Sequence, residues 1–269
     1  MKIGIFLDHL RDASLQTGKP LEFIAKEAVA AGFEFIHVNG EFWMANEERI
    51  DQFLQNTGLT IGSVDLLCQL TQGKDTDKAE NLIRFMSRKG VEQLLLIPGF
   101  VHEAQSRKAA MEQAALHMKQ LLYLARGLHV KCSLEDYDNQ KAPFGTWQEL
   151  KWFVERLPDL GVCFDTGNFA FFGQDAIVAY DQLEPYICFV HAKDRKYIGR
   201  DGEESLLTVD GKRLYPSATG SGEMPISEIV SRLKAKKFDA GIIVEHFGSA
   251  DMYEDMCQSV RWLKGQLST

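Results

Sequence analysis

Four side chains that could bind a metal ion stand at the ends of four successive apolar runs in the second half of the chain. They are Glu135, Asp165, His191 and Glu245. In each run the residue two positions earlier is small or apolar. If the runs are β-strands, period-2 alternation directs all four side chains to the same face. If those strands are parallel neighbours, three carboxylates and one imidazole meet at one level.

A buried cluster of this kind would be unstable without a cation, because neighbouring carboxylates repel one another and raise one another's pKa values. A divalent ion removes that repulsion. Three carboxylates and one imidazole form an oxygen-rich ligand set, which favours Mn²⁺ or Mg²⁺ and tolerates Co²⁺ or Zn²⁺. The set holds no sulfur, which argues against a thiol-selecting site. The pattern therefore predicts one divalent metal ion bound by these four residues.

Each of these residues also has a simpler interpretation when it is taken alone. Asp165 precedes a Thr-Gly pair, where an aspartate commonly caps the next turn or helix. His191 at a strand end could be a hydrogen-bonded core residue. The metal hypothesis is favoured because four strands in succession end in the same way.

Short apolar runs alternate with longer amphipathic segments along the chain, and this pattern predicts strands separated by helices. The expected strands are residues 2–8, 33–39, 60–67, 93–99, 130–136, 161–167, 186–194 and 240–247. The expected helices are residues 20–32, 75–90, 103–127, 146–157, 227–236 and 251–266. Thr146 and Glu149 have the spacing of a capping box at the start of the fourth helix.

Eight strand units in 269 residues predict an α/β fold, a (β/α)8 TIM barrel, as a single domain over residues 1–269. An open doubly wound sheet would carry a GxGxxG or GxxxxGK[ST] turn after its first strand, and the chain has neither there. Active sites of barrels lie at the carboxyl ends of the strands. A long insertion at about 195–224 would lie over that mouth, and the runs on either side of Asp210-Gly211 predict a small hairpin within it.

Composition excludes several classes of function. The net charge is −8 and the basic residues are scattered, which disfavours a nucleic-acid partner. No apolar run approaches the roughly 20 residues that span a bilayer, and the N-terminus lacks the features of a signal peptide. The five cysteines show no CxxC spacing, which is typical of buried reduced thiols in a cytoplasmic protein.

The stretches SLEDYD, FDTGNFAFFG, FVHAKDR, TGSGEMPI and IIVEHF resemble, in order, those of the xylose isomerase-like TIM barrels. This sugar phosphate isomerase/epimerase superfamily includes ketose 3-epimerases and inosose-processing enzymes, and the resemblance covers nearly the whole chain. It implies that Glu135, Asp165, His191 and Glu245 bind the metal, and that Glu135 and Glu245 transfer the proton. It also implies a homodimer or homotetramer. One departure is Asn168, which stands where the family commonly has a histidine that contacts substrate.

The expected function is a divalent-metal-dependent isomerase or epimerase that acts on a sugar or sugar phosphate through a cis-enediolate. One alternative is a metal-dependent lyase that dehydrates an inosose-type cyclic polyol. Another is a non-catalytic sugar-binding barrel. An endonuclease of abasic DNA is disfavoured, because it would need a basic face and more than the seven histidines present. The expected contacts to the carbohydrate substrate are Asn168, Lys193, Arg195, Glu41 and His102.

Overall fold

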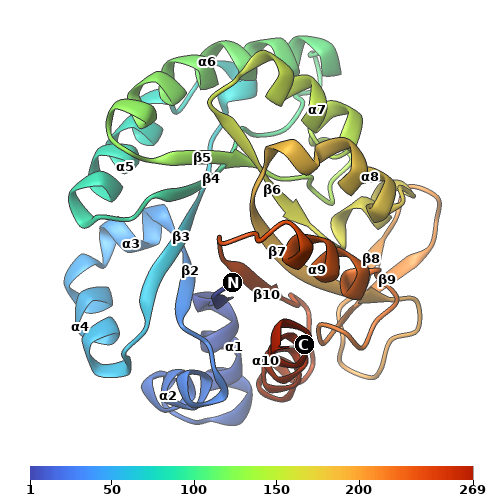
Figure 1. Cartoon of the computed structure of the whole chain (residues 1–269). Helices are drawn as coiled ribbons and strands as arrows, with labels where there is room; N and C mark the ends of the chain where they lie inside the picture. The colour runs from blue at the N-terminus through green and yellow to red at the C-terminus, as the bar shows by residue number, and fades with distance from the viewer. Residues whose placement is uncertain (269) are drawn as a thin grey trace.

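A closed ring of parallel strands forms the centre of the computed structural model, which describes residues 1–268 (Figure 1). The strands pair in the order β10-β1-β2-β3-β4-β5-β6-β7, and β10 also pairs with β7, so the sheet closes on itself. Every pair in this ring is parallel. The strands are β1 (Ile3–Phe6), β2 (Phe35–Asn39), β3 (Thr60–Leu67), β4 (Gln93–Ile97), β5 (Lys131–Leu134), β6 (Leu160–Asp165), β7 (Ile187–Lys196) and β10 (Ile242–Glu245).

Helices surround the ring on its outer side, as Figure 1 shows. They are α1 (Leu7–Thr17), α2 (Leu21–Ala31), α3 (Gly40–Ala45), α4 (Glu47–Thr57), α5 (Thr76–Lys89), α6 (Arg107–Gly127), α7 (Trp147–Arg156), α8 (Ala176–Leu183), α9 (Ile226–Ala235) and α10 (Met252–Ser268). Short 3-10 helices lie at η1 (Leu70–Gln72), η2 (Asn168–Phe172) and η3 (Glu184–Tyr186). This arrangement confirms the predicted (β/α)8 barrel.

The six expected helices are present, and their ends follow the local capping chemistry. The predicted capping box of α7 is confirmed, because the side chains of Thr146 and Glu149 each accept a backbone N–H from the other residue. Helix α6 begins at Arg107 instead of residue 103. Ser106 sets this start, since its side chain accepts a hydrogen bond from the backbone N–H of Ala109.

Helices α1, α3, α4 and α8 were not expected from the sequence. Helix α1 begins at Leu7, directly after β1, so no turn residue separates the two elements and the apolar run looked like one longer strand. The sequence of helix α4 did contain a pattern that predicts a helix. Its residues Ile50, Phe53 and Thr57 are buried on one face, and Gly58 ends it at a φ of 81°.

Strand β7 differs from the expected strand in a way that matters for the site. It continues to Lys196, because its residues 194–196 pair antiparallel with β9 (Arg213–Ser217). His191 therefore lies in the middle of β7 and not at its end. It still lies level with Asp165, because the two residues are register partners across β6 and β7.

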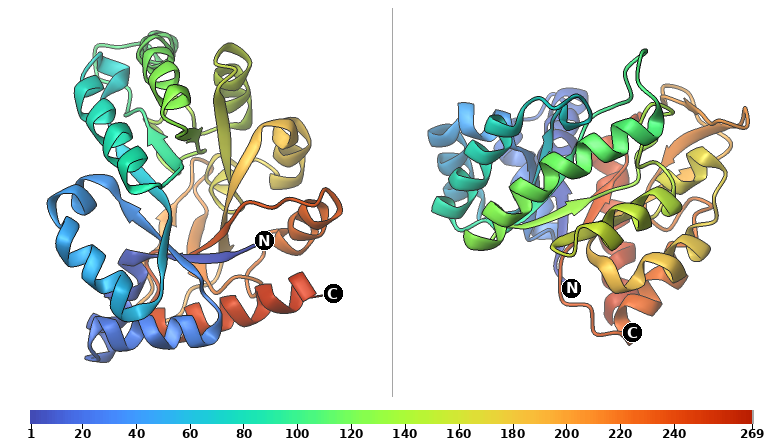
Figure 2. Two further views of the ribbon diagram at one scale, coloured as in Figure 1. Left: turned by 60° about the vertical axis from the view of Figure 1, so that its left-hand side comes forward. Right: turned by 90° about the horizontal axis from the view of Figure 1, so that it is seen from above.

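The connection after β7 contains the expected hairpin. Strand β8 (Leu206–Leu207) pairs antiparallel with β9 around the turn at Asp210-Gly211. Figure 2 shows this hairpin at the end of the barrel opposite the two chain termini. Asp194 holds the segment that follows β9, since its carboxylate accepts the backbone N–H groups of Gly220, Gly222 and Met224.

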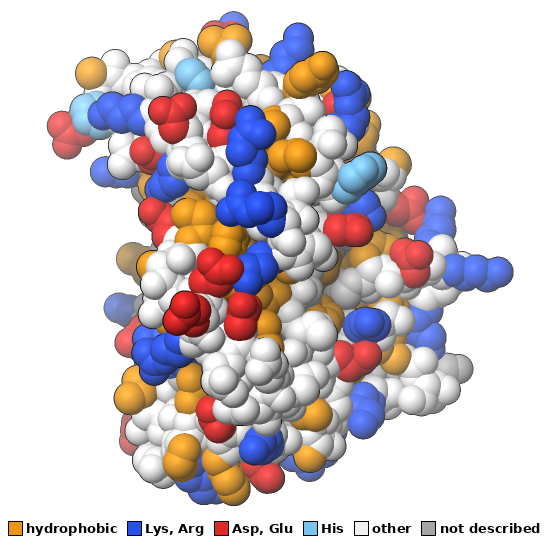
Figure 3. All heavy atoms as spheres, turned by 90° about the vertical axis from the view of Figure 1, so that its left-hand side faces the viewer, with side chains coloured by type: hydrophobic (Ala, Val, Ile, Leu, Met, Phe, Trp, Pro, Cys, Tyr) orange, Lys and Arg blue, Asp and Glu red, His pale blue; other side chains and the backbone are white. Residues whose placement is uncertain are grey.

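The five cysteines are all free, and Cys68, Cys132 and Cys163 are buried. The outer face that carries α3, α4 and α5 shows acidic and basic side chains mixed together (Figure 3). Among the described residues, no helix has both the length and the apolar character to cross a membrane.

Candidate metal centre

The four predicted metal ligands come together at one level of the barrel. Glu135 follows β5 directly, Asp165 and Glu245 end β6 and β10, and His191 lies within β7. One donor atom from each of Glu135, Asp165, His191 and Glu245 can be chosen so that all four lie within 4.8 Å of one another. All four residues are buried, with at most 6% of their surface exposed. Parallel pairing and side-chain alternation produce this convergence, as the sequence pattern predicts.

The carboxylate of Asp165 has two separate roles. Its Oδ1 accepts the backbone N–H groups of Gly167 and Asn168, each at 2.7 Å, and so it caps the turn after β6. Its Oδ2 is buried and has no hydrogen-bond partner. Burial raises the pKa of Asp165 well above its usual value, and the negative charges of Glu245 and Glu135 raise it further. An ordinary turn cap needs no such second oxygen, whereas a metal ligand does.

His191 is the second group whose surroundings suit a cation. Its Nδ1 lies 2.5 Å from Glu135 Oε1 and 3.1 Å from Glu245 Oε2. Both are ion-pair contacts, and Nε2 has no hydrogen-bond partner. Bonds of about 2.1 Å to one metal ion would place adjacent ligand atoms about 3 Å apart. The separation from Glu245 matches the edge of a coordination shell, and the separation from Glu135 would widen by about 0.5 Å when an ion binds.

Glu245 directs one oxygen to the centre and the other to a lysine. Its Oε1 lies 2.6 Å from Lys193 Nζ, while its Oε2 faces His191. Burial alone would raise the pKa of Glu245, but the charge of Lys193 and the contact with His191 hold it well below its usual value. Glu245 is therefore kept as a carboxylate, which is the form that binds a metal ion or accepts a proton.

Asn168 positions this lysine. Its Oδ1 accepts a hydrogen bond of 2.7 Å from Lys193 Nζ, and its Nδ2 donates to the backbone carbonyl of Asp136 at 2.9 Å. Asn168 is buried and lines the cavity above the metal ligands. Its amide thus takes part in the architecture of the site, in addition to any contact with a substrate hydroxyl.

Lys193 and Arg195 both line the cavity, and both meet the same acidic residue. Lys193 Nζ lies 3.4 Å from Asp138 Oδ2, and Arg195 Nη2 donates to that oxygen at 3.1 Å. Arg195 is 5% exposed, and its Nε has no partner. The side chains of Lys193 and Arg195, both predicted to bind substrate, therefore lie at the cavity.

The opposite wall of the cavity comes from β1, β2 and β3. His37 lies 3.0 Å from Asp65 through its Nε2, and Asn39 Nδ2 donates to the other oxygen of Asp65 at 2.8 Å. Phe6 at the end of β1 adds apolar surface to this wall, and Phe247 adds more from the segment after β10. The cavity has a volume of about 440 Å³, which is large enough for a small ligand.

Two predicted substrate contacts lie outside the lining of this cavity. Glu41 lies in α3 with a half-exposed side chain, and it forms an ion pair with Lys78 at 3.4 Å. His102 is exposed in the connection between β4 and α6. Both residues line a neighbouring hollow beside the ends of β3 and β4.

Three polar residues of the site were not found from the sequence. Asp65 is the one acidic residue in an apolar strand and lies two residues after Ser63. Strand alternation could therefore have indicated that both side chains share a face. Asp138 lies in the loop after β5, where the sequence has no periodicity. Cys163 precedes Asp165 by two residues on β6, and its thiol lies 3.7 Å from Glu135 Oε1.

The sequence matches the family model described as "Xylose isomerase-like TIM barrel" over residues 25–266. The chain belongs to this family. The resemblance of its short motifs to this group is thereby confirmed. No curated protein matches the sequence.

Several solved structures share the fold of this family member. A D-tagatose 3-epimerase-like protein is 19% identical, with a TM-score of 0.75, and the match covers 100% of this chain and 97% of that one. A D-psicose 3-epimerase, solved in the presence of D-fructose, is 14% identical, with a TM-score of 0.73 and full coverage of both chains. The IolI protein with a bound zinc atom is 15% identical, with a TM-score of 0.73 over 98% of this chain and 96% of that one.

Proposed function

We propose that this protein is a divalent-metal-dependent isomerase or epimerase that moves a proton on the carbon next to a sugar carbonyl. The observation that carries the proposal is the convergence of four donors from four strands, with Asp165 Oδ2 buried and unpartnered among them. The epimerases among the similar structures support the same class of reaction.

The residues present fit one divalent ion, which Glu135, Asp165, His191 and Glu245 would hold. When bound there, Mn²⁺ or Mg²⁺, or alternatively Co²⁺ or Zn²⁺, would polarise the carbonyl of the substrate and make the neighbouring C–H more acidic. The zinc atom in the IolI structure shows that a member of this fold holds such an ion.

Glu135 and Glu245 are the groups that would move the proton. They come from β5 and β10, strands that are separated in the ring by β6 and β7, so they can approach a bound sugar from different sides. Glu245 is ionised beside Lys193 and is suited to act as the base. Return of the proton to the same carbon from the other carboxylate inverts that centre, and return to the adjacent carbon isomerises the sugar through the cis-enediolate.

The remaining polar groups of the cavity would orient the substrate. Asp65 and Asp138 can accept hydrogen bonds from sugar hydroxyls, and Lys193 and Arg195 can donate to oxygens. Phe6 and Phe247 offer apolar surface to the C–H faces of a sugar ring or chain. Precise orientation matters because a reacting C–H must lie within reach of a carboxylate.

The test is an assay of proton exchange in D₂O with a panel of neutral and phosphorylated ketoses, after loading with Mn²⁺ or Mg²⁺. NMR spectra should show deuterium at the carbon next to the carbonyl, together with an epimer or aldose product. Glu135→Gln and Glu245→Gln should each lower the rate by about 10²–10⁴-fold. Glu112→Gln, on the outer helix α6 with a 59% exposed side chain, is the control and should retain the wild-type rate.

The other candidate functions give different results in this assay. A dehydratase acting on an inosose would release water and form an unsaturated product. A sugar-binding barrel without turnover would bind ketoses in calorimetry and incorporate no deuterium. Either result would replace the isomerase proposal.

A further inference from the structure

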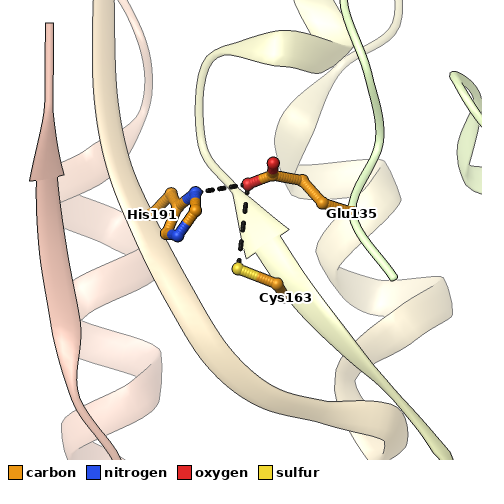
Figure 4. A group of neighbouring side chains, drawn as sticks. All are labelled: Glu135, Cys163 and His191. Atoms are coloured by element: carbon orange, nitrogen blue, oxygen red, sulfur yellow. Dashed lines mark hydrogen bonds and ion pairs between the residues drawn. The ribbon is translucent and has the colours of Figure 1, made fainter. Parts of the chain in front are cut away.

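The metal centre has a thiol directly beneath it. Cys163 and Asp165 are two residues apart on β6, so both side chains point into the barrel and Cys163 lies one layer deeper. Figure 4 shows Cys163, Glu135 and His191 directed toward one another from β6, the end of β5 and β7. One donor atom from each of these three residues lies within 4.8 Å of the others.

The distance between sulfur and oxygen in this trio suits a metal ion with a sulfur ligand. Cys163 Sγ lies 3.7 Å from Glu135 Oε1, and the same oxygen lies 2.5 Å from His191 Nδ1. Zn–S bonds of about 2.3 Å and Zn–O bonds of about 2.1 Å place sulfur and oxygen about 3.6 Å apart in a tetrahedral site. The separation between Cys163 and Glu135 therefore needs almost no adjustment to accommodate an ion, whereas Glu135 Oε1 and His191 Nδ1 would move apart by about 0.9 Å.

A second observation supports a ligand at this place. His191 is 1% exposed, and neither of its ring nitrogens has a hydrogen-bond partner. Cys163 is fully buried. A buried imidazole with no hydrogen-bond partner, between a carboxylate and a thiol, offers the mixed N, O and S donors that zinc and cadmium prefer.

We propose that Glu135, Cys163 and His191 form a second, thiolate-containing binding mode for a soft divalent ion such as Cd²⁺ or Zn²⁺. This mode lies deeper than the one that includes Asp165 and Glu245. The two modes share Glu135 and His191, so one ion excludes the other. A soft ion in the deeper position removes Glu135 from proton transfer and inhibits the protein, whereas Mg²⁺ and Mn²⁺ have little affinity for sulfur and stay with the oxygen ligands.

The binding step is balanced without any further reactant. The thiol of Cys163 gives up one proton to the buffer, and a metal–sulfur bond replaces its S–H bond. A water molecule can complete the shell, as in zinc sites with three protein ligands. No oxidation is involved. The choice of metal does not depend on which reaction the protein catalyses, whereas the inhibition rests on the proposed function.

The experiment measures binding of Cd²⁺ and Mn²⁺ to the chelator-treated full-length protein. Cd²⁺ should produce an ultraviolet charge-transfer band of the thiolate with one equivalent of metal. Cys163→Ser should abolish this band and weaken Cd²⁺ binding by ~100-fold or more, while Mn²⁺ affinity, measured by electron paramagnetic resonance, changes by less than about 10-fold. Cys132→Ser, an equally buried thiol on β5 outside both donor groups, should keep the band.

A second variant separates the two modes. Asp165→Asn keeps an oxygen to cap the turn but loses the ligand charge, so it should weaken Mn²⁺ binding by about 100-fold and leave the Cd²⁺ band in place. The proposal is overturned if wild-type protein shows no band, or if Cys163→Ser retains it. If the Cys163 variant does not fold, the ¹¹³Cd chemical shift of the wild-type complex decides, because sulfur coordination moves it strongly downfield and an all-oxygen and nitrogen site does not.

Discussion

Lys193 Nζ lies 2.6 Å from Glu245 Oε1, and the two residues are register partners across β7 and β10. The pairing of the last two strands of the barrel thus places the buried ammonium group of Lys193 next to Glu245, one of the two candidate proton-transfer carboxylates. Asn168 holds the same ammonium group from the side of β6. Lys193 and Asn168 therefore keep Glu245 ionised and oriented within the protein itself.

Lys193→Met should reduce kcat of the proposed reaction by about 10²–10³-fold, because Glu245 loses the charge that keeps it ionised and in place. The measurement is steady-state turnover of the best ketose found in the exchange assay. Lys196→Met is the matched control, since Lys196 lies on the same strand but pairs with Glu203 at 2.8 Å, away from the centre. Equal rates in the two variants would contradict the role given to Lys193.

Addition of Mn²⁺ should raise the thermal stability of the chelator-treated protein. Without a cation the buried carboxylates repel one another, and binding to the folded state alone stabilises it by about 2.7 kcal/mol at 100 times Kd. Scanning calorimetry with and without Mn²⁺ measures the shift. Asp165→Asn should lose most of the shift. A shift of the same size in that variant would place the bound ion elsewhere.

His9 should make the protein less stable in acid. It accepts the backbone N–H of His246 through Nε2 at 2.9 Å, so the ring must be neutral. Burial lowers the pKa of His9 well below its usual value, and the nearby His246, Lys193 and His191 lower it further, while Glu245 partly opposes them. In the unfolded chain His9 binds a proton below about pH 6.5, whereas in the folded protein it does not. The free energy of unfolding therefore falls as the pH decreases below about 6.5.

Urea unfolding between pH 8 and pH 5 tests this expectation with His9→Gln. The variant should be less stable than wild-type protein at pH 8, because a buried hydrogen bond is weakened by about 1 kcal/mol. Its disadvantage should shrink as pH falls below about 6.5. His102→Gln, an exposed histidine, should follow the wild-type pH dependence. A constant difference between His9→Gln and wild type across this range would refute the assignment.

Arg200, in the connection after β7, forms an ion pair with Asp255 of α10. Its Nη2 donates to both oxygens of Asp255 at 2.9 Å, and its Nε donates to Glu203 at 2.7 Å. Arg200→Ala should cost about 1–2 kcal/mol, since Asp255 is buried and Arg200 is half-exposed.

Hydrogen exchange measures the effect where it should occur. Residues 197–212 should exchange faster in Arg200→Ala, while β1 to β6 stay protected. Arg213→Ala removes an exposed contact to Ser205 in the same insertion and should leave exchange unchanged. Uniformly faster exchange across the barrel would show that Arg200 supports the whole fold instead.

The sequence by itself determined the barrel and its four candidate metal ligands. Both depend on short-range periodicity. Alternation along a strand tells which side chains share a face, and parallel strands bring their carboxyl ends to one rim, so the convergence of Glu135, Asp165, His191 and Glu245 could be derived without coordinates. The capping box at Thr146 is equally local.

Only the tertiary structure decided which residues meet across strands and loops. The β6–β7 register shifts between Val162 and Cys163, and beyond that irregularity Cys163 lies opposite Phe189 and Asp165 opposite His191. The register of β10 against β7 then pairs Glu245 with Lys193. The path of the loop after β5 brings Asp138 to the cavity. These placements depend on inter-strand stagger and loop closure, which are long-range properties of the closed barrel and leave no periodic signal in the chain.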